Sequence, residues 1–142
     1  MVIDTHHSSF AFSRTFPGQV TVSRFSAAYF TMALFTDLAY AQTTILMWKD
    51  FSSWLLFAGM LAAGLAVILW LIGQALYRSR PNWVVVALNA VVLVAAFVNN
   101  LFHAGDGWTA IVPWGLGLSL VTVLLMLISA TVSRQANDRA LG

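Results

Sequence analysis

Four long apolar runs constrain the fold of this chain more than any other feature of its sequence. They cover residues 25–48, 54–77, 83–102 and 112–132. Each reaches the roughly 20 residues that an α-helix needs to cross a hydrocarbon core of about 30 Å. Because lipid offers backbone N–H and C=O groups no partner, such runs are expected to be helical, and they lack the alternating pattern of a barrel strand. The short connections between them predict antiparallel neighbours.

The predicted fold class is therefore all-α, an antiparallel bundle of four transmembrane helices over residues 23–133. A flexible or interfacial segment precedes it at 1–22, and a cytoplasmic tail follows at 134–142. Composition agrees, since 60% of the residues are hydrophobic and 8% are charged, whereas soluble domains carry roughly 25% charged residues. A water-soluble globule is excluded, and membrane lipid is the expected surrounding.

The basic residues predict how the bundle is oriented. Lys49 falls on one side of the predicted membrane, and all six arginines fall on the other: Arg14, Arg24, Arg78, Arg80, Arg134 and Arg139. By the positive-inside rule, both termini are cytoplasmic. The expected location is a bacterial inner membrane, with the loops around Lys49–Asp50 and His103–Asp106 facing the periplasm.

A second interpretation treats the first run as a signal peptide. Arg24, a short apolar stretch and the A-x-A sequence Ala39-Tyr40-Ala41 are consistent with it. Against it, the run stays apolar as far as Trp48, and Asp37 interrupts the end of the apolar region.

Asp37 is the residue that most needs an explanation, because it lies about halfway along the first run. A charged Asp at the bilayer centre costs about 2.5–3.5 kcal/mol, so the side chain should face protein, find a partner or carry a proton. Small and polar residues recur with it at helical spacing, and a matching polar stripe lies on the third run. The two stripes predict an outward-opening polar cluster formed by Asp37, Tyr40, Asn99, Asn100, His103 and Asp106.

Two interpretations of this cluster stay open. Its hydrogen bonds fix the register of the helices, at about 0.6 kcal/mol each, or its carboxyl group forms a proton-linked or ligand site. Asp106, between two glycines, also fits a turn, and His103 also fits a solvated loop. Close helix packing is expected at two pairs of small residues, Gly59 with Ala63 and Gly115 with Ser119, either within the bundle or in a homo-oligomer.

Several chemistries lack their residues. The chain has no cysteine, which excludes disulfides, iron–sulfur clusters and thiolate zinc sites. His103 is the single histidine near a run, so a haem held by two histidines of one subunit is not expected. No catalytic triad order, P-loop or dinucleotide motif is present, and the dense basic stripe of a nucleic-acid-binding protein is missing. No catalytic residue, metal or cofactor is predicted, and an enzyme is disfavoured.

Two stretches resemble the DUF2231 family of small four-helix membrane proteins. They are Leu34 to Trp54 and Asn99 to Leu116, and the likeness extends from about Arg24 to Val132. The resemblance implies that the family retains these positions: Asp37, Asn89, His103, Asp106, Gly107, Trp108 and Pro113. The chain departs from the family pattern at Ser23 to Ser26 in place of His-Pro, at Gly73 or Gln74 in place of an Asp, and at Val85 in place of a His. The resemblance suggests association with periplasmic sugar or alcohol dehydrogenases.

Three functions are considered, in this order. The first is a non-enzymatic accessory or anchoring subunit for a periplasmic partner, with redox proteins among the candidates. The second is a small proton or solute carrier that uses Asp37. The third is an intramembrane redox protein that binds a quinone or a haem shared between subunits.

Overall fold

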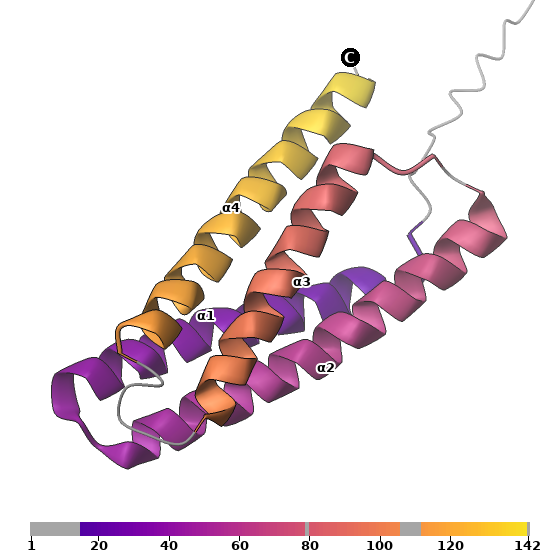
Figure 1. The fold of residues 1–142 in the computed structure, drawn as a ribbon. Helices are drawn as coiled ribbons and strands as arrows, with labels where there is room; N and C mark the ends of the chain where they lie inside the picture. Colours follow the sequence, from indigo (N-terminus) through magenta and orange to yellow (C-terminus); the bar gives the residue numbers. More distant parts are fainter. Residues whose placement is uncertain (1–14, 79, 106–111, 142) are drawn as a thin grey trace, which may run out of the picture.

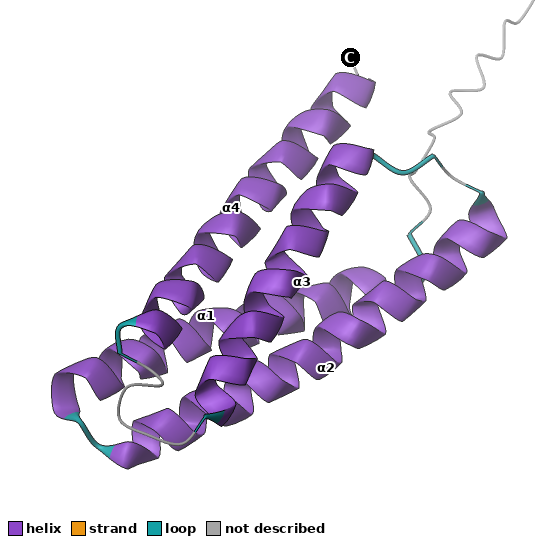
Figure 2. Cartoon of the chain, viewed as in Figure 1, coloured by secondary structure: helices purple, strands orange, loops and turns teal. Residues whose placement is uncertain are grey.

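A computed structural model describes residues 15–78, 80–105 and 112–141, which form four α-helices and no strand (Figures 1 and 2). The helices are α1 (Gln19–Thr43), α2 (Leu46–Tyr77), α3 (Trp83–Ala104) and α4 (Trp114–Leu141). Consecutive helices run antiparallel. α1 packs on α2 and α3 on α4, and the two hairpins meet through α1 against α4 and α2 against α3.

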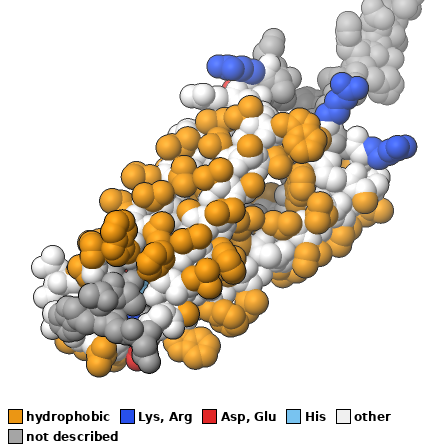
Figure 3. All heavy atoms as spheres, viewed as in Figure 1, with side chains coloured by type: hydrophobic (Ala, Val, Ile, Leu, Met, Phe, Trp, Pro, Cys, Tyr) orange, Lys and Arg blue, Asp and Glu red, His pale blue; other side chains and the backbone are white. Residues whose placement is uncertain are grey.

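The two ends of the bundle differ in charge. One end, here the loop end, carries the α1–α2 and α3–α4 connections. The opposite end, here the arginine end, carries the arginines that the structure describes (Figure 3). Each lies near the start or the end of a helix: Arg24, Arg78, Arg80, Arg134 and Arg139. Lys49 lies in the first turn of α2, at the loop end. Arg14 lies outside the described residues.

The α1–α2 connection lies earlier in the chain than the sequence predicted. α1 ends at Thr43 and α2 begins at Leu46, so the first helix covers 19–43 instead of 25–48 and the second 46–77 instead of 54–77. Thr44 adopts the left-handed conformation (φ 57°), and its N–H donates to the carbonyl of Tyr40, which closes α1. A threonine at positive φ leaves no sequence signal comparable to a glycine. Lys49 and Asp50 therefore lie inside α2 and not in a loop.

The boundaries of α3 lie close to the predicted ones, whereas α4 continues well beyond its predicted end. Asn82 caps α3 by accepting hydrogen bonds from the backbone N–H groups of Val84 and Val85, a common role for this residue type. α4 follows Pro113 and continues to Leu141, so residues 134–141, predicted as a separate tail, extend the last helix. Polar residues there end the apolar run without ending the helix.

Three of the helices are long and apolar enough to cross a membrane: Leu46–Tyr77, Trp83–Ala104 and Trp114–Ala136. In each, about a fifth of the most apolar window is buried inside the protein, and large apolar side chains cover the outside. Helix α1 does not reach the same hydropathy, because Ser, Thr and Asp side chains interrupt it. Its outward face is nevertheless apolar, as the exposure of Phe25, Met32 and Phe35 shows.

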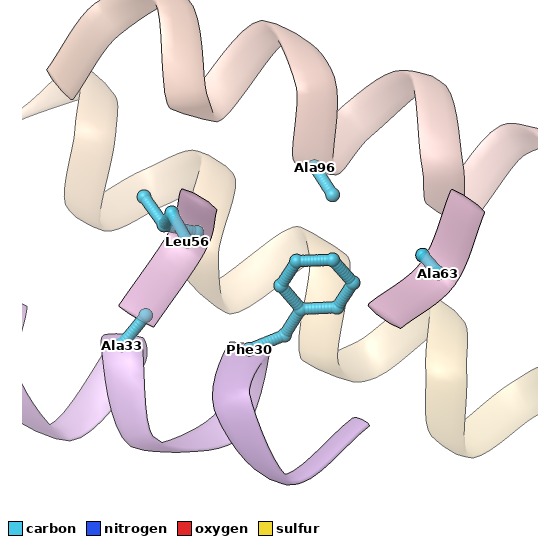
Figure 4. Packing of buried hydrophobic residues seen from close by; sticks show 5 residues of the cluster. All are labelled: Phe30, Ala33, Leu56, Ala63 and Ala96. Carbon is cyan, nitrogen blue, oxygen red and sulfur yellow. The ribbon is translucent and has the colours of Figure 1, made fainter. Parts of the chain in front are cut away.

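The apolar core is small and lies midway along the bundle. Phe30 is its one aromatic residue, surrounded by the short side chains of Ala33, Ala63 and Ala96 and by Leu56 (Figure 4). Outside this cluster, the buried side chains that the structure describes are more often polar than apolar. In a lipid surrounding, apolar burial gives the helices little drive to associate, so packing of small residues and interhelical hydrogen bonds are expected to hold them together.

Candidate functional site

The carboxyl group of Asp37 lies at the meeting point of all four helices. The Asp37 side chain is fully buried, two turns from the end of α1. Three side chains contact it, one from each of the other helices. Ser52 of α2 donates to Oδ1, His103 Nε2 of α3 lies 2.9 Å from the same oxygen, and Ser119 of α4 donates to Oδ2 at 2.5 Å. We call Asp37, Ser52, His103 and Ser119 the polar layer.

The contacts of His103 fix how many protons the Asp37–His103 pair holds. Nδ1 lies 2.9 Å from the backbone carbonyl oxygen of Asn99. A carbonyl oxygen only accepts, so Nδ1 carries a hydrogen. The 2.9 Å contact between Nε2 and Asp37 Oδ1 then requires one proton between these two atoms. The pair is either imidazolium with carboxylate or neutral imidazole with carboxylic acid, and both states have zero net charge.

The net neutrality explains how the pair is tolerated. Both side chains are completely shielded from solvent, and an uncompensated charge in such a place is costly. Here the charges either cancel across a hydrogen bond or are absent. The two serine hydroxyls donate to the same carboxyl group, Ser52 to Oδ1 and Ser119 to Oδ2, so both carboxyl oxygens have hydrogen-bond partners.

A hydrogen-bonded chain leads from the carboxyl group to Asn99. The Asn99 amide Nδ2 donates a hydrogen bond to Ser119 Oγ at 2.7 Å, and the Ser119 hydroxyl in turn donates one to Asp37 Oδ2. Asn99 is fully buried, and its amide oxygen Oδ1 has no hydrogen-bond partner among the described residues. A free buried acceptor costs about 1–3 kcal/mol. The network therefore ends in an acceptor that is able to take a hydrogen bond from a water molecule or a ligand.

The structure places three of the six predicted cluster residues in one network: Asp37, Asn99 and His103. Tyr40 is buried one turn closer to the loop end, and Asn100 is half-buried on α3. Asp106 lies outside the described residues. His103 belongs to the last turn of α3 and is buried, which contradicts the alternative of a solvated loop histidine.

The predicted packing residues lie inside the bundle. Gly59 and Ala63 are buried on α2, where a side chain at Gly59 would come within 2.6 Å of the Phe30 ring. Gly115 is buried in the first turn of α4. Ser119 serves the network as well as the packing, a role that helical spacing alone did not indicate.

Ser52 is the member of the polar layer that the sequence prediction missed. It was placed outside the second run because that run was expected to start at residue 54. With α2 beginning at Leu46, Ser52 falls on the same face as Leu56, Gly59 and Ala63. The spacing i, i+4, i+7, i+11 is that of one helix face. It predicts that Ser52 points into the bundle, provided that the connection is placed at Thr44–Ile45.

Among the described residues, no group of three or more His, Asp or Glu side chains is placed to hold a metal ion. The polar layer instead has the components of a proton relay: a carboxyl group, an imidazole and two hydroxyls joined by hydrogen bonds.

A family model matches residues 21–139, and its description is "Predicted membrane protein (DUF2231)". Neither the curated proteins nor the solved structures contain a match to the chain. The matched residues include α2 and α3 whole, α1 apart from its first two residues and α4 apart from its last two, and with them the entire polar layer.

Proposed function

Because the chain belongs to the DUF2231 family of predicted membrane proteins, we propose that it is a small proton-linked carrier whose Asp37–His103 pair takes up and releases the transported proton. Intramembrane ionisable residues mark proton relays and ion pathways in membrane proteins. The observation that carries the proposal is the hydrogen bond of His103 Nδ1 to the Asn99 carbonyl. It leaves one shared proton between Nε2 and the carboxyl group.

A purely structural role accounts less well for the composition of the site. Helix register needs only neutral hydrogen bonds, such as the one that Ser129 donates to Asn89 Oδ1 at 3.0 Å. Serine and asparagine supply these without a titratable group. The polar layer instead combines the two side chains of a shared-proton pair, and a free acceptor on Asn99 lies next to it.

The anchoring role considered from the sequence has no comparable support. It depends on the outer loop with Asp106 and Trp108, which lies outside the described residues. Association with a periplasmic partner or with a second copy stays a prediction.

The proposal includes four crossings of a bacterial inner membrane with both termini in the cytoplasm. The exposed apolar residues of α1 support a fourth span, since the polar residues in the middle of this helix, Ser26, Thr36 and Asp37, are buried. The gathering of arginines at one end supports the orientation through the positive-inside rule.

Proton flux into liposomes that contain the purified protein tests the function. Under an imposed pH gradient, the wild type should move protons at a rate that Asp37→Asn abolishes, because an amide neither gains nor loses a proton near neutral pH. The amide is expected to preserve folding: its Nδ2 donates to neutral His103, and Ser52 turns its hydroxyl to the carbonyl of Ala33, 3.4 Å away.

The matched control is Asp50→Asn, the same chemical change at an exposed position on α2. It should leave the flux at the wild-type level. Equal flux from the wild type, the Asp37 variant and empty liposomes would reject proton transport and leave the network a structural role.

A further inference from the structure

The interior of the bundle repeats in layers that are seven residues apart. Seven residues, or two helical turns, cover about 10 Å. Moving by seven from each member of the polar layer toward the arginine end gives a second set, here the sealing layer: Phe30, Gly59, Ala96 and Met126. A second step of seven gives a third set, here the open layer: Ser23, Ala66, Asn89 and Ser133.

The sealing layer closes the interior with one large ring. Phe30 is 2% exposed and points from α1 toward Ala63 and Ala96 (Figure 4). A Cβ at Gly59 would lie 2.6 Å from the ring, so the ring rests on the bare backbone of α2. Met126 of α4 packs on the same cluster. The side chains of this layer carry no hydrogen-bonding group, and the carbonyl oxygen of Gly59 accepts a hydrogen bond from the buried Ser26 hydroxyl at 3.0 Å. The layer is therefore expected to exclude water.

The residues of the open layer lie on the same faces of the four helices as the other two layers, but they are more exposed. Ser23, Asn89 and Ser133 are exposed and Ala66 is half-buried, although their counterparts in the other two layers point into the interior. This exposure agrees with Figure 1, in which the α1–α2 and α3–α4 hairpins lie farther apart at the arginine end than at the loop end. The region between the hairpins at this end is here the opening, and the seven-residue repeat puts Ser23, Asn89 and Ser133 on the helix faces turned toward it.

We propose that Phe30 is a hydrophobic gate that separates a water-filled opening at the arginine end from the polar layer around Asp37. Water reaches Asn89 and Ser133 and stops at the Phe30 ring. Protons pass between the opening and Asp37 only when the ring leaves its place on Gly59. The purpose of the gate rests on the proposed function, whereas its position is tested without any flux measurement.

Cysteine labelling tests the gate, because the chain has no cysteine of its own and each introduced thiol is the only target. A membrane-impermeant maleimide is added to sealed vesicles, and Arg139→Cys identifies the preparation in which the arginine end is accessible. From that side Asn89→Cys should react readily. Ser119→Cys, in the polar layer, should be protected.

Removing the Phe30 ring should change the labelling of Ser119→Cys and leave that of Asn89→Cys as it was. In the Ser119→Cys background, Phe30→Ala should raise labelling from the arginine side severalfold. Phe35→Ala is the matched control: it removes the same ring from the outward face of α1, where the side chain is 58% exposed, and should raise nothing. Met126→Ala gives a second way to open the same layer if the Phe30 variant does not fold.

Each result decides the proposal. Protection of Asn89→Cys, labelling of Ser119→Cys with Phe30 in place, or unchanged labelling in both opened variants would overturn it. These outcomes are independent of the flux assay. A protein that moves no protons is still able to show the predicted labelling, and failure of the gate leaves the Asp37→Asn flux result intact.

Discussion

The two halves of the bundle are built from the same four helices but hold different interiors. At the loop end, four polar side chains converge with no exposed surface. At the arginine end, the corresponding positions carry exposed polar residues, and the hydrogen bonds between helices include those that Ser129 donates to Asn89 and Ser26 to the carbonyl oxygen of Gly59. The difference agrees with the arrangement of the two hairpins, which lie farther apart at the arginine end than at the loop end (Figure 1). The ionisable pair therefore lies at the end where the four helices converge.

The largest effect is expected from removing the carboxyl group of Asp37 in the polar layer at the loop end. Asp37→Leu leaves Ser52, His103 and Ser119 without their shared acceptor, and removing one partner of a buried pair costs about 3–5 kcal/mol. Thermal unfolding in detergent measures the loss. Asp37→Asn should cost far less, because an amide offers both a donor and an acceptor. Equal destabilisation by the two substitutions would contradict the network.

The sealing layer should respond next most strongly, to a single added methyl group. Gly59→Ala places a Cβ 2.6 Å from the Phe30 ring, and overpacking of this severity costs up to about 3 kcal/mol. Gly64→Ala on the same helix meets nothing within 4 Å and should stabilise by roughly 0.5–1 kcal/mol, because alanine favours the helix. If both variants shift the melting temperature in the same direction, Phe30 does not rest on Gly59 as described.

A pair of serine substitutions compares the two halves directly. Ser119→Ala removes the donor to Asp37 and the acceptor of Asn99 together, and leaving a buried polar group unpaired costs about 1–3 kcal/mol. Ser129→Ala removes one hydrogen bond to an exposed amide and should cost about 0.6 kcal/mol. Thermal unfolding of both variants in the same detergent gives the ratio. A larger loss of stability from Ser129→Ala than from Ser119→Ala would contradict the description of the loop end as the more tightly hydrogen-bonded end.

The sequence predicted the helical class and the burial of Asp37 against protein partners, because both follow from the cost of polar groups in lipid. Run length predicted four helices, three of which meet the length and hydropathy of a membrane span. Helical spacing put His103 and Asp37 on stripes that were able to meet. These inferences need only periodicity and the properties of single residues.

The turn and the serines could not be predicted in the same way. The connection at Thr44–Ile45 depends on a left-handed threonine, which local sequence does not specify, and the charged pair Lys49–Asp50 suggested a loop instead. That shift removed Ser52 from the expected bundle. The contact of Ser119 with Asp37 depends on how α4 is rotated against α1, which is a property of packing and leaves no periodic signal.

The smallest change in the free energy of unfolding is expected in the open layer, where its sign shows whether the region faces water or lipid. Asn89→Leu removes one hydrogen bond at an exposed position and should change the free energy of unfolding by no more than about 0.6 kcal/mol, the average for one interhelical bond. If Asn89 faces water, leucine gains nothing there, since its apolar surface stays hydrated. If Asn89 faced lipid, replacing an amide by leucine would remove the cost of an exposed polar group and stabilise the protein. Unfolding measured in lipid bicelles distinguishes the two, and a clear gain in stability would show that the opening at the arginine end is filled by lipid.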